Sequence, residues 1–503
     1  MLMENLINST YEHALALCYH NIDNRGLLIN TRKKEQVRIA VQDELDTNCQ
    51  YLSQLWNIAV YVGAENAPSG DKKLNINAPT KVLETLKNLG YKIPKIRKKN
   101  VETDSYDFED SASKLALVKL LIDPTLWPSP FAGEGIKKLL EVKEAITFRN
   151  RYLNARLYKN IYFSNYNVAS TLTGRRGSKK TIFNLGGNAQ NFPSRGRLSN
   201  LWKECIIARP GRIFYFVDQV SAEDWPVQAL SQNHHALEQM RQGVNRHYIF
   251  ASKIFNVTVD ALKAARDNKD GLYTKAQQEE AELQYYMGKK GRHSNNYGMQ
   301  PTRLSEAIAS EVRISVPVQT CKNILTTVDQ IDPNVKRIYH IYIQEELTKS
   351  SHLLRTPLGR ERQFLGLRSG EKNYSILNEA YSYIPQSTVG DNTGLAVIEL
   401  EKCNNYILQD GHDSLCQELP DNERELRRVF TDTAKAFKRT ITFHNGIEVE
   451  IPIEGQLGYD WKDKIKLKDY TEDSLMDAYN KIRKEKEQYV NGADYCPGCM
   501  GGM

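Results

Sequence analysis

The sequence of 503 residues contains no apolar run long enough to cross a membrane. A spanning helix needs about 20 consecutive, predominantly apolar residues, and charged residues interrupt every candidate stretch before that length. The first nine residues also lack the charged and then apolar pattern of a secretory signal. These absences argue against a membrane or exported protein and predict a cytoplasmic one.

Cysteine is scarce as well, with eight residues scattered along the chain. So few cysteines indicate a reducing compartment and free thiols rather than a disulfide framework. The exception is Cys496-Pro-Gly-Cys499 near the C-terminus, a spacing that supplies only half of a zinc site. Because no second pair lies nearby, an inert or redox-labile tail is favoured over a structural zinc.

The composition is that of a folded, soluble protein. Apolar residues make up 40% and charged residues 26% of the chain, and its length predicts about two to four domains. The net charge of +7 is compatible with a phosphate-rich partner. Basic clusters stand at Lys72–Lys73, Lys95–Lys99, Arg175–Lys180 and Lys289–Arg292, although any one of them can be a solvated face.

The character of the chain changes near Thr171. The first 160 residues have mainly helical spacing, with a basic and then acidic segment over 91–110 that we expect to be a loop. Glycine and asparagine become dense from Thr171 to Pro193. The apolar run Arg212–Asp218 then predicts a buried strand that ends in a carboxylate, and residues 235–330 return to helical spacing.

Three later segments predict tight turns. Thr356–Arg360 is typical of a turn between short strands. Asn405–Leu419 predicts strand, turn and strand, with Gly411, His412 and Asp413 in the turn. Residues 441–453 alternate like a hairpin with Asn445-Gly446 at its tip.

Asp218 and Asp413 therefore stand where an acid can leave a sheet edge and meet a ligand. Two carboxylates can bind a pair of Mg²⁺ ions about 3.5–4 Å apart, which clamp the attacking and leaving oxygens in phosphoryl transfer. An isolated aspartate at such a place is more often a turn or cap residue. A third element is needed to decide between these interpretations.

That element is the segment around Lys289. Lys289, His293 and Tyr297 are spaced i, i+4, i+8 and line one helical face. A cation, an imidazole and a phenol make a poor core but a good wall for a nucleotide. Gly298 follows as a helix-ending residue. The alternative is an amphipathic surface helix whose lysine reaches into solvent.

Taken in order, the strand ending at Asp218, the Lys289–Tyr297 face with Gly298, and the turn His412-Asp413 resemble motifs A, B and C of the family A DNA polymerases, most closely the bacteriophage type. Nearly the whole chain shares in the resemblance. The other matching segments are Asn75–Thr80 with Leu86–Ile96, Thr173-Gly-Arg175, Asn188-Ala-Gln-Asn-Phe-Pro193, Gly243–Ala251, Tyr383-Ile-Pro-Gln386-Ser-Thr388 and Ile451–Trp461. Each segment alone is unspecific, whereas their ordered combination is specific.

The resemblance implies an α+β protein with the right-hand polymerase fold. A helical thumb would cover residues 1–165, and an antiparallel-sheet palm would begin at 166–230 with motif A. Helical fingers with motif B would cover 231–375, and the palm would resume at 376–503 with motif C. The basic residues 90–100 would then grip duplex phosphates from the thumb.

The resemblance also implies residue roles. Asp218, Asp413 and the main-chain carbonyl of Gln219 would bind the two Mg²⁺ ions. Glu223 would be the gate that rejects a ribose 2′-hydroxyl. The residues expected to bind the dNTP are Lys289, which would also act in catalysis, with His293, Tyr297, Glu223 and His247. Those expected to contact the primer–template minor groove, where all correct pairs offer similar acceptors, are Arg175, Gln386 and His412.

The chain departs from the family pattern at four positions. Motif A ends Glu223-Asp224-Trp225, without the usual arginine, and Tyr285 stands where the family has a phosphate-binding arginine. Arg292 or Lys290 could substitute for it. The usual aromatic of motif B is His293, and Ser414 replaces the glutamate of motif C.

Thumb-like sequence begins almost at Met1, so we expect no proofreading 3′–5′ exonuclease in this chain. The expected partners are primer–template DNA and dNTPs, and a phage helicase, a processivity factor or a separate exonuclease are further candidates. For a phage protein, the cytoplasm would be that of the host cell.

Two alternatives stay open. The first is a single-subunit RNA polymerase, which shares the palm chemistry and a His-Asp-Ser motif C. Glu223 as a sugar gate and the Asn-x-Gln-Asn-x-Pro segment argue against it. The second is a catalytically dead DNA-binding accessory subunit. Retention of Asp218, Asp413 and Lys289 argues against that, because a binding protein has no use for carboxylates that repel each other and the DNA.

Overall fold

The computed structural model describes residues 9–63, 66–70, 72–99, 106–168, 170–193, 196–366 and 373–491. The chain forms two compact units. Unit 1 comprises Met1–Val37, Tyr152–Leu237 and Ile338–Met503, and unit 2 comprises Arg38–Arg151 and Glu238–Arg337. Among the described residues no helix is long and apolar enough to cross a membrane. The predicted thumb, palm and fingers boundaries stay predictions, and the Cys496–Cys499 pair lies outside the described residues.

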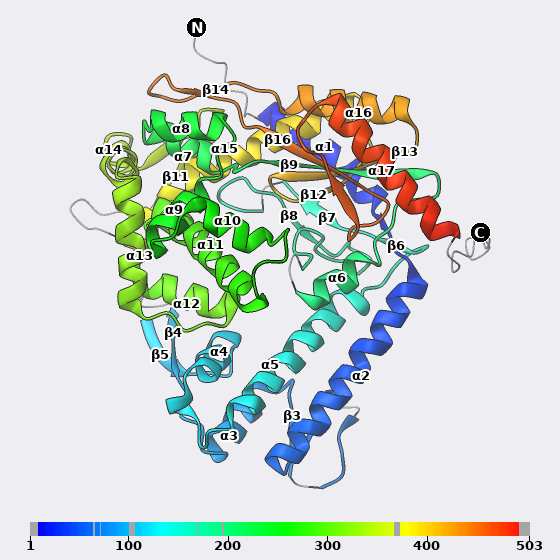
Figure 1. Ribbon diagram of the computed structural model, residues 1–503, viewed down its shortest axis with the longest axis vertical. Coiled ribbons are helices and arrows are strands. Elements are labelled where there is room, and N and C mark those ends of the chain that lie inside the picture. The colour runs from blue at the N-terminus through cyan, green and yellow to red at the C-terminus, as the bar shows by residue number, and fades with distance from the viewer. Residues whose placement is uncertain are drawn as a thin grey trace. The chain divides into compact units, whose positions relative to one another are not determined.

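Unit 1 combines a five-stranded sheet with long helices (Figure 1). Its helices are α1 (Ser9–Arg25), α6 (Arg197–Lys203), α7 (Asp224–Leu230), α14 (Ile341–Lys349), α15 (Tyr374–Lys402), α16 (Glu423–Phe437) and α17 (Glu472–Asn491). Its strands are β1 (Leu27–Leu28), β6 (Ile161–Tyr162), β7 (Asn165–Asn167), β8 (Gly177–Lys179), β9 (Arg212–Gln219), β10 (Leu353–Arg355), β11 (Glu361–Gln363), β12 (Ile407–Asp410), β13 (Ser414–Pro420), β14 (Ile441–Thr442), β15 (Glu448–Val449), β16 (Ile453–Gly458) and β17 (Lys464–Lys466).

The sheet has the order β12–β13–β9–β16–β17 and every neighbouring pair is antiparallel. The apolar run that predicted a strand is β9, which lies at the centre of the sheet. Because side chains alternate between the faces of a strand, Ile213 and Tyr215 pack into a core with α16 and α17. Phe214 and Phe216 point the other way, and Phe216 meets the ring of Trp461. Asp218 continues this second face to the end of the strand.

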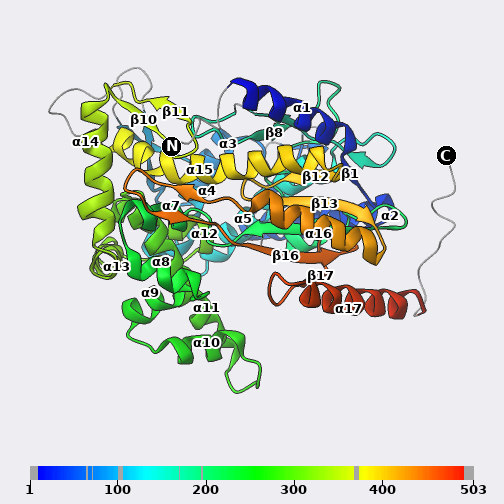
Figure 2. The same ribbon diagram turned by 90° about the horizontal axis from the view of Figure 1, so that it is seen from above.

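The long helix α15 crosses unit 1 and packs along α1, α7 and α16 (Figure 2). Most of its length is buried, including a polar stretch from Ser387 to Thr393. Polar groups inside a protein are normally hydrogen-bonded, and Asn392 and Thr393 of this stretch pair with Gln219 on β9 and with the carbonyl of His412 in the turn between β12 and β13. The helix therefore serves as the platform behind the predicted aspartates.

Unit 2 is mainly helical. Its helices are α3 (Pro79–Asn88), α4 (Lys114–Ile122), α5 (Gly133–Phe148), α9 (Arg246–Phe255), α10 (Val259–Asp267), α11 (Lys275–Asn296), α12 (Pro301–Val312) and α13 (Val318–Ile331), and its strands are β2 (Ala59–Tyr61), β3 (Lys73–Asn75), β4 (Lys95–Lys99) and β5 (Tyr106–Asp110). Two helices continue from one unit into the other, α2 (Thr31–Trp56) and α8 (His234–Arg241).

Close helix packing positions α11, which carries the predicted nucleotide-binding face. A Cβ atom on Gly288 would lie 2.7 Å from the backbone nitrogen of Ala251 on α9, so only glycine allows the two helices to approach this closely. On its other side α11 contributes Met287 to a core with Ile308 on α12 and Ile324 on α13. The helix is thus fixed between neighbours.

One expectation was wrong. The segment expected to be a loop contains two paired strands, because β4 (Lys95–Lys99) and β5 (Tyr106–Asp110) are antiparallel and Lys95 stands opposite Asp110. Opposite charges across a strand pair stabilise it, and this complementarity does not show in either segment alone. The first 160 residues are mainly helical, as their spacing predicted, and α1 ends at Arg25, where Gly26 turns the chain at φ +57°. The predicted strand and hairpins at 212–218, 356–360, 405–419 and 441–453 are confirmed.

Candidate active site

Asp218 and Asp413 lie next to each other at one end of the sheet. Asp218 pairs in register with Ser414, the residue after Asp413. The backbone N–H of Gln219 donates to the carbonyl of Asp413 at 3.1 Å, so the two chain segments are locked at this point. Both carboxylates are half-buried. The structure therefore brings together the two acids that the sequence placed on separate elements.

The turn between β12 and β13 holds Asp413 in place. His412 has a left-handed φ of +86°, which is uncommon for a residue other than glycine. Its backbone N–H donates to Asp410 Oδ1 at 2.6 Å, and its carbonyl accepts the hydroxyl of Thr393 on α15 at 2.9 Å. A conformation that costs energy is thus held by hydrogen bonds on both sides.

The donor set around Asp413 suits a hard cation. Burial raises the pKa of Asp413, nearby Arg175 lowers it, and Glu223 raises it again. A buried carboxyl of this kind is stabilised as an anion by a bound cation. Within the described residues no group of three or more His, Cys, Asp or Glu side chains could hold a metal by itself. Two carboxylates fit Mg²⁺, which keeps several waters and takes further oxygens from a phosphate substrate.

Gln219 does more than the sequence suggested. Its side chain is buried, and its amide Nε2 donates to Thr393 Oγ1 at 2.8 Å. Its Oε1 accepts from Asn392 at 2.7 Å, and Asn392 in turn accepts from Arg439 at 2.6 Å. These contacts fix the end of β9 against α15. The role of its main-chain carbonyl as a metal ligand stays a prediction.

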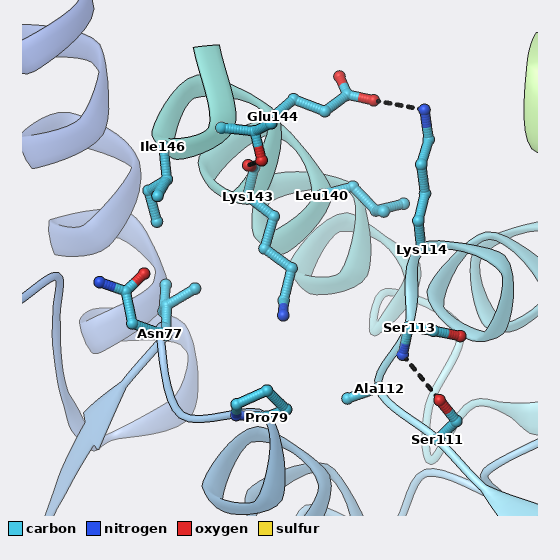
Figure 3. A pocket seen from close by; sticks show the side chains of 12 residues that line it. Asn77, Pro79, Ser111, Ala112, Ser113, Lys114, Leu140, Lys143, Glu144 and Ile146 are labelled. Carbon is cyan, nitrogen blue, oxygen red and sulfur yellow. Dashed lines mark hydrogen bonds and ion pairs between the residues drawn. The ribbon is translucent and has the colours of Figure 1, made fainter. Parts of the chain in front are cut away.

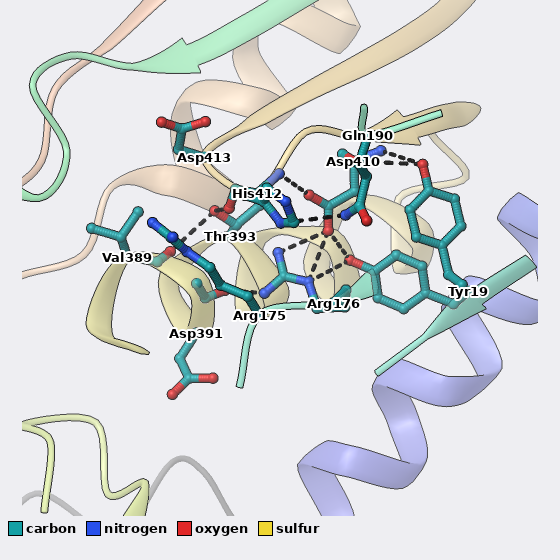
Figure 4. A network of polar contacts seen from close by, with 12 residues as sticks. Tyr19, Arg175, Arg176, Gln190, Val389, Asp391, Thr393, Asp410, His412 and Asp413 are labelled. Atoms are coloured by element: carbon teal, nitrogen blue, oxygen red, sulfur yellow. Dashed lines mark hydrogen bonds and ion pairs between the residues drawn. The ribbon is translucent and has the colours of Figure 1, made fainter. Parts of the chain in front are cut away.

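A charged network behind the turn escaped the sequence reasoning. Asp410 Oδ2 accepts from Nε of Arg176 at 2.8 Å and from the hydroxyl of Tyr19 (Figure 4). Asp410 and Arg176 are fully buried. Each residue lies close to a predicted site residue in the sequence, Arg176 beside Arg175 and Asp410 two residues before His412. Nothing in the sequence, however, pairs positions 234 residues apart.

The predicted DNA-contacting residues of unit 1 gather around the same turn. Arg175 forms an ion pair with Glu223, the predicted sugar gate. The imidazole Nδ1 of His412 lies 3.4 Å from the amide of Gln190. Gln386 is on α15 one turn before Gly390, whose carbonyl accepts from Arg176. Arg175, Glu223 and His412 therefore belong to one neighbourhood with Asp413, and Gln386 lies further along α15.

Unit 2 carries four of the five predicted nucleotide-binding residues, on α11 and at the start of α9. The rings of His293 and Tyr297 meet edge to face, 5.0 Å apart, as their spacing predicted. Lys289 is exposed on the same face of α11. His247 lies at the beginning of α9, where Asn245 caps its backbone N–H at 3.1 Å. Burial and the charges of Lys289, His293 and two arginines lower the pKa of His247 to about 3.

Comparison with known families gives this arrangement its context. A model of the DNA polymerase family A matches residues 62–463. The chain belongs to DNA polymerase family A. Among solved structures it is similar to the POL domain of Pol1 from M. smegmatis in complex with DNA primer–template and dNTP, with a TM-score of 0.68 and 16% sequence identity over 90% of this chain and 70% of that one. No curated protein matches significantly. The α+β right-hand polymerase fold is thereby confirmed.

The departures from the family A pattern have visible surroundings. Tyr285 is covered by the guanidinium of Arg266, 3.8 Å from its ring centroid, and its hydroxyl accepts from Asn245 at 3.1 Å. Lys290 is paired with Glu311, whereas Arg292 is buried with Nη1 3.5 Å from the imidazole of His247. Of the two suggested substitutes for the missing arginine, Arg292 is therefore the one beside the predicted phosphate contacts.

Trp225, at another of the four unusual positions, is buried, and its indole N–H donates to the carbonyl of Val220 at 3.1 Å. That contact closes the bend between β9 and α7, just after Asp218 and Glu223. The indole thus replaces a charged side chain with a packing contact.

A separate pocket of about 530 Å³ lies in unit 2 between α5 and the starts of α3 and α4 (Figure 3). The ammonium of Lys143 points into it, and burial lowers the pKa of that group. Among the described residues Lys143 forms no ion pair, while neighbouring Glu144 pairs with Lys114 at 3.4 Å and with Arg313 at 2.6 Å. The pocket therefore offers an unneutralised cation.

Proposed function

We propose that this family A protein is a template-directed DNA polymerase that adds dNTPs to a primer 3′ end with two Mg²⁺ ions, as in phage replication. The observation that carries the proposal is the placement of Asp218 and Asp413 side by side at the end of β9 and the adjoining turn. When bound, the ions activate the 3′-hydroxyl and neutralise the triphosphate and pyrophosphate. The chain supplies the two carboxylates, which Gln219 and Thr393 hold in register.

The cluster on α9 and α11 would bind the triphosphate of the dNTP. Lys289 supplies an exposed ammonium, and charge-assisted hydrogen bonds to phosphate are among the stronger ones. His247 is neutral in the surrounding positive field, and the neutral imidazole keeps one N–H that can donate to a phosphate oxygen. The anionic substrate in turn favours the protonated imidazole. His293 and Tyr297 provide ring surfaces for the base and sugar.

Arg175, Gln386 and His412 would read the primer–template minor groove. His412 is in the turn of Asp413 and the charge of Arg175 acts on that carboxyl, so the base pair at the primer end would be examined beside the carboxylates. Backbone phosphates would be held elsewhere, with Lys143 and its pocket a suitable place for one of them.

Primer extension on a defined template with Mg²⁺ and one dNTP at a time tests the proposal. We expect templated incorporation by the wild type and none by Asp413→Ala. If the wild type binds the duplex but never extends it, the accessory-subunit alternative is correct. Preference for rNTPs over dNTPs would favour the RNA polymerase alternative.

Glu223 gives a sharper test of sugar choice. Glu223→Ala removes the bulk that would exclude a 2′-hydroxyl, and discrimination against one small extra group is typically worth about 10- to 200-fold. Glu223→Gln is the matched control, because it keeps the bulk and removes only the charge that pairs with Arg175. The dNTP-to-rNTP ratio of kcat/KM should fall for Ala and hold for Gln.

Proofreading is a separate question. We propose that this chain does not shorten a primer with a mismatched 3′ end. The purified protein incubated with such a primer, Mg²⁺ and no dNTP should leave it intact. Metal-dependent shortening would show that the expectation was wrong and leave the polymerase proposal untouched.

A further inference from the structure

The turn that carries Asp413 is held from behind by one buried carboxylate. Asp410 ends β12, three residues before Asp413. Its Oδ1 accepts the backbone N–H of His412 at 2.6 Å. Its Oδ2 accepts from Arg176 Nε at 2.8 Å and from the Tyr19 hydroxyl. A single side chain therefore ties the turn to fixed points inside unit 1 (Figure 4).

Arg176, the partner of Asp410 in a buried ion pair, is equally fixed. Arg176 is fully buried, and its Nη1 donates to the carbonyl of Gly390 on α15. The backbone N–H of Asp410 donates to the hydroxyl of Tyr166 at 3.2 Å. The ion pair thus connects β12 with α15, with Tyr19 on α1 and with Tyr166 on β7. None of these groups can move far without breaking several contacts.

Stability alone does not account for this pair. Removing two charges from water costs about as much as their attraction returns, so a buried ion pair adds little to the net free energy of folding. The turn, however, contains His412 at a φ of +86°, a conformation that persists only where the surroundings hold it. The acceptor that holds it is Asp410, and the residue whose position depends on it is Asp413.

We propose that Arg176 and Asp410 are positioning residues: their buried ion pair holds the β12–β13 turn in the conformation that sets Asp413 beside Asp218. The inference rests on the proposed function, because it takes Asp413 to be a metal ligand. Neither residue touches substrate or metal itself. Both act through the backbone of His412.

The test compares two equivalent substitutions on one hairpin. Asp410→Asn leaves one acceptor oxygen where His412 and Arg176 require two. Glu418→Gln is the control, because Glu418 is also buried and its two oxygens accept from the backbone N–H and the guanidinium of Arg209, both at 2.8 Å. Both variants lose a buried negative charge. Because Glu418 lies on β13 beyond the turn, only Asp410→Asn should loosen the turn that carries Asp413.

Metal binding is measured directly in the full chain with Mn²⁺ as the probe. Free Mn²⁺ is followed by electron paramagnetic resonance in the presence of primer–template with a dideoxy end and the next dNTP, so that no turnover occurs. Loss of a group that orients a metal ligand typically weakens metal affinity by about 10- to 100-fold. We expect that loss for Asp410→Asn and a change below about twofold for Glu418→Gln. Primer extension should lose kcat with little change in the KM for dNTP.

A second pair of variants covers the case in which Asp410→Asn does not fold. Tyr19→Phe removes one donor to Asp410 and keeps the ion pair. Its control is Tyr162→Phe, since Tyr162 is buried and its hydroxyl makes no hydrogen bond to the described residues. Tyr19→Phe should weaken Mn²⁺ binding in the same direction by a few-fold, and Tyr162→Phe should not.

Equal effects of the site and control variants on Mn²⁺ affinity would overturn the inference and leave the proposed function standing if the wild type extends primers. A wild type that binds no Mn²⁺ with primer–template and dNTP present would overturn both. The inference is supported if Asp410→Asn or Tyr19→Phe weakens Mn²⁺ binding and its control variant does not.

Discussion

The β12–β13 turn of unit 1 and the α9–α11 cluster of unit 2 handle charge in opposite ways. Around the turn, charged side chains have partners, as in the buried pair of Arg176 with Asp410 and the half-buried pair of Arg175 with Glu223. In the cluster, the positive field of Lys289, His293 and nearby arginines lowers the pKa of His247, and Lys289 forms no ion pair within the described residues. We infer that the turn is built for fixed geometry and the cluster for binding and release.

The largest expected effect comes from removing a carboxylate beside the turn. Asp218→Ala should abolish primer extension by at least about 10³-fold, because a metal ion contributes several kcal/mol of charge stabilisation in phosphoryl transfer. The melting temperature should hold or rise, since one of two neighbouring like charges is gone. Glu454→Ala is the control, because Glu454 stands opposite Asp218 on β16. If the Asp218 variant still extended primers, Asp218 would not be needed to bind a catalytic metal ion, and the region around the turn would not be the catalytic site.

The cluster should respond through substrate affinity. Lys289→Ala should lower kcat/KM for dNTP by about 10- to 100-fold, as expected for one charge-assisted hydrogen bond worth about 1.5–3 kcal/mol. Lys290→Ala is the control, since that neighbour is paired with Glu311. Steady-state kinetics on one template would separate the two. Equal losses in both variants would mean that net charge, not the face of α11, binds the nucleotide.

The sequence predicted those features of the two regions that depend on neighbouring residues, and missed those that depend on contacts between distant segments. The β9 strand, the turn at Gly411–Asp413 and the Lys289–His293–Tyr297 face follow from local periodicity and turn chemistry, and all three are confirmed as local structures. The ordered motifs then predicted the fold. The Arg176–Asp410 pair was missed because it depends on which distant segments meet, and the β4–β5 hairpin was missed because its stabilising charges come from two segments.

Acid should lower the free energy of unfolding through His247 in the cluster. With a pKa of about 3 in the folded chain and about 6.5 when unfolded, His247 binds its proton only in the unfolded state between these values. Stability should therefore fall as pH drops from about 6.5 towards 3, by up to about 1.4 kcal/mol per pH unit. His247→Gln should flatten this dependence in denaturant titrations across that range. The exposed His234, changed to Gln, should leave it as in the wild type.

The smallest effect tests whether an unneutralised cation marks a binding place elsewhere in unit 2. Lys143 points into its pocket without an ion pair among the described residues, and burial lowers its pKa. Lys143→Ala should weaken duplex binding by a few-fold and reduce the slope of log affinity against log salt by about 0.9, the value for one phosphate contact. Lys137→Ala, on the same helix but paired with Glu134 at 3.6 Å, should change that slope less.

Removing a partly buried cation should also leave the free protein as stable as before or slightly more so. A protein that loses stability but keeps its salt slope would show that Lys143 packs the pocket rather than binding DNA, and an unpaired cation would then no longer distinguish binding regions from structural ones in this molecule.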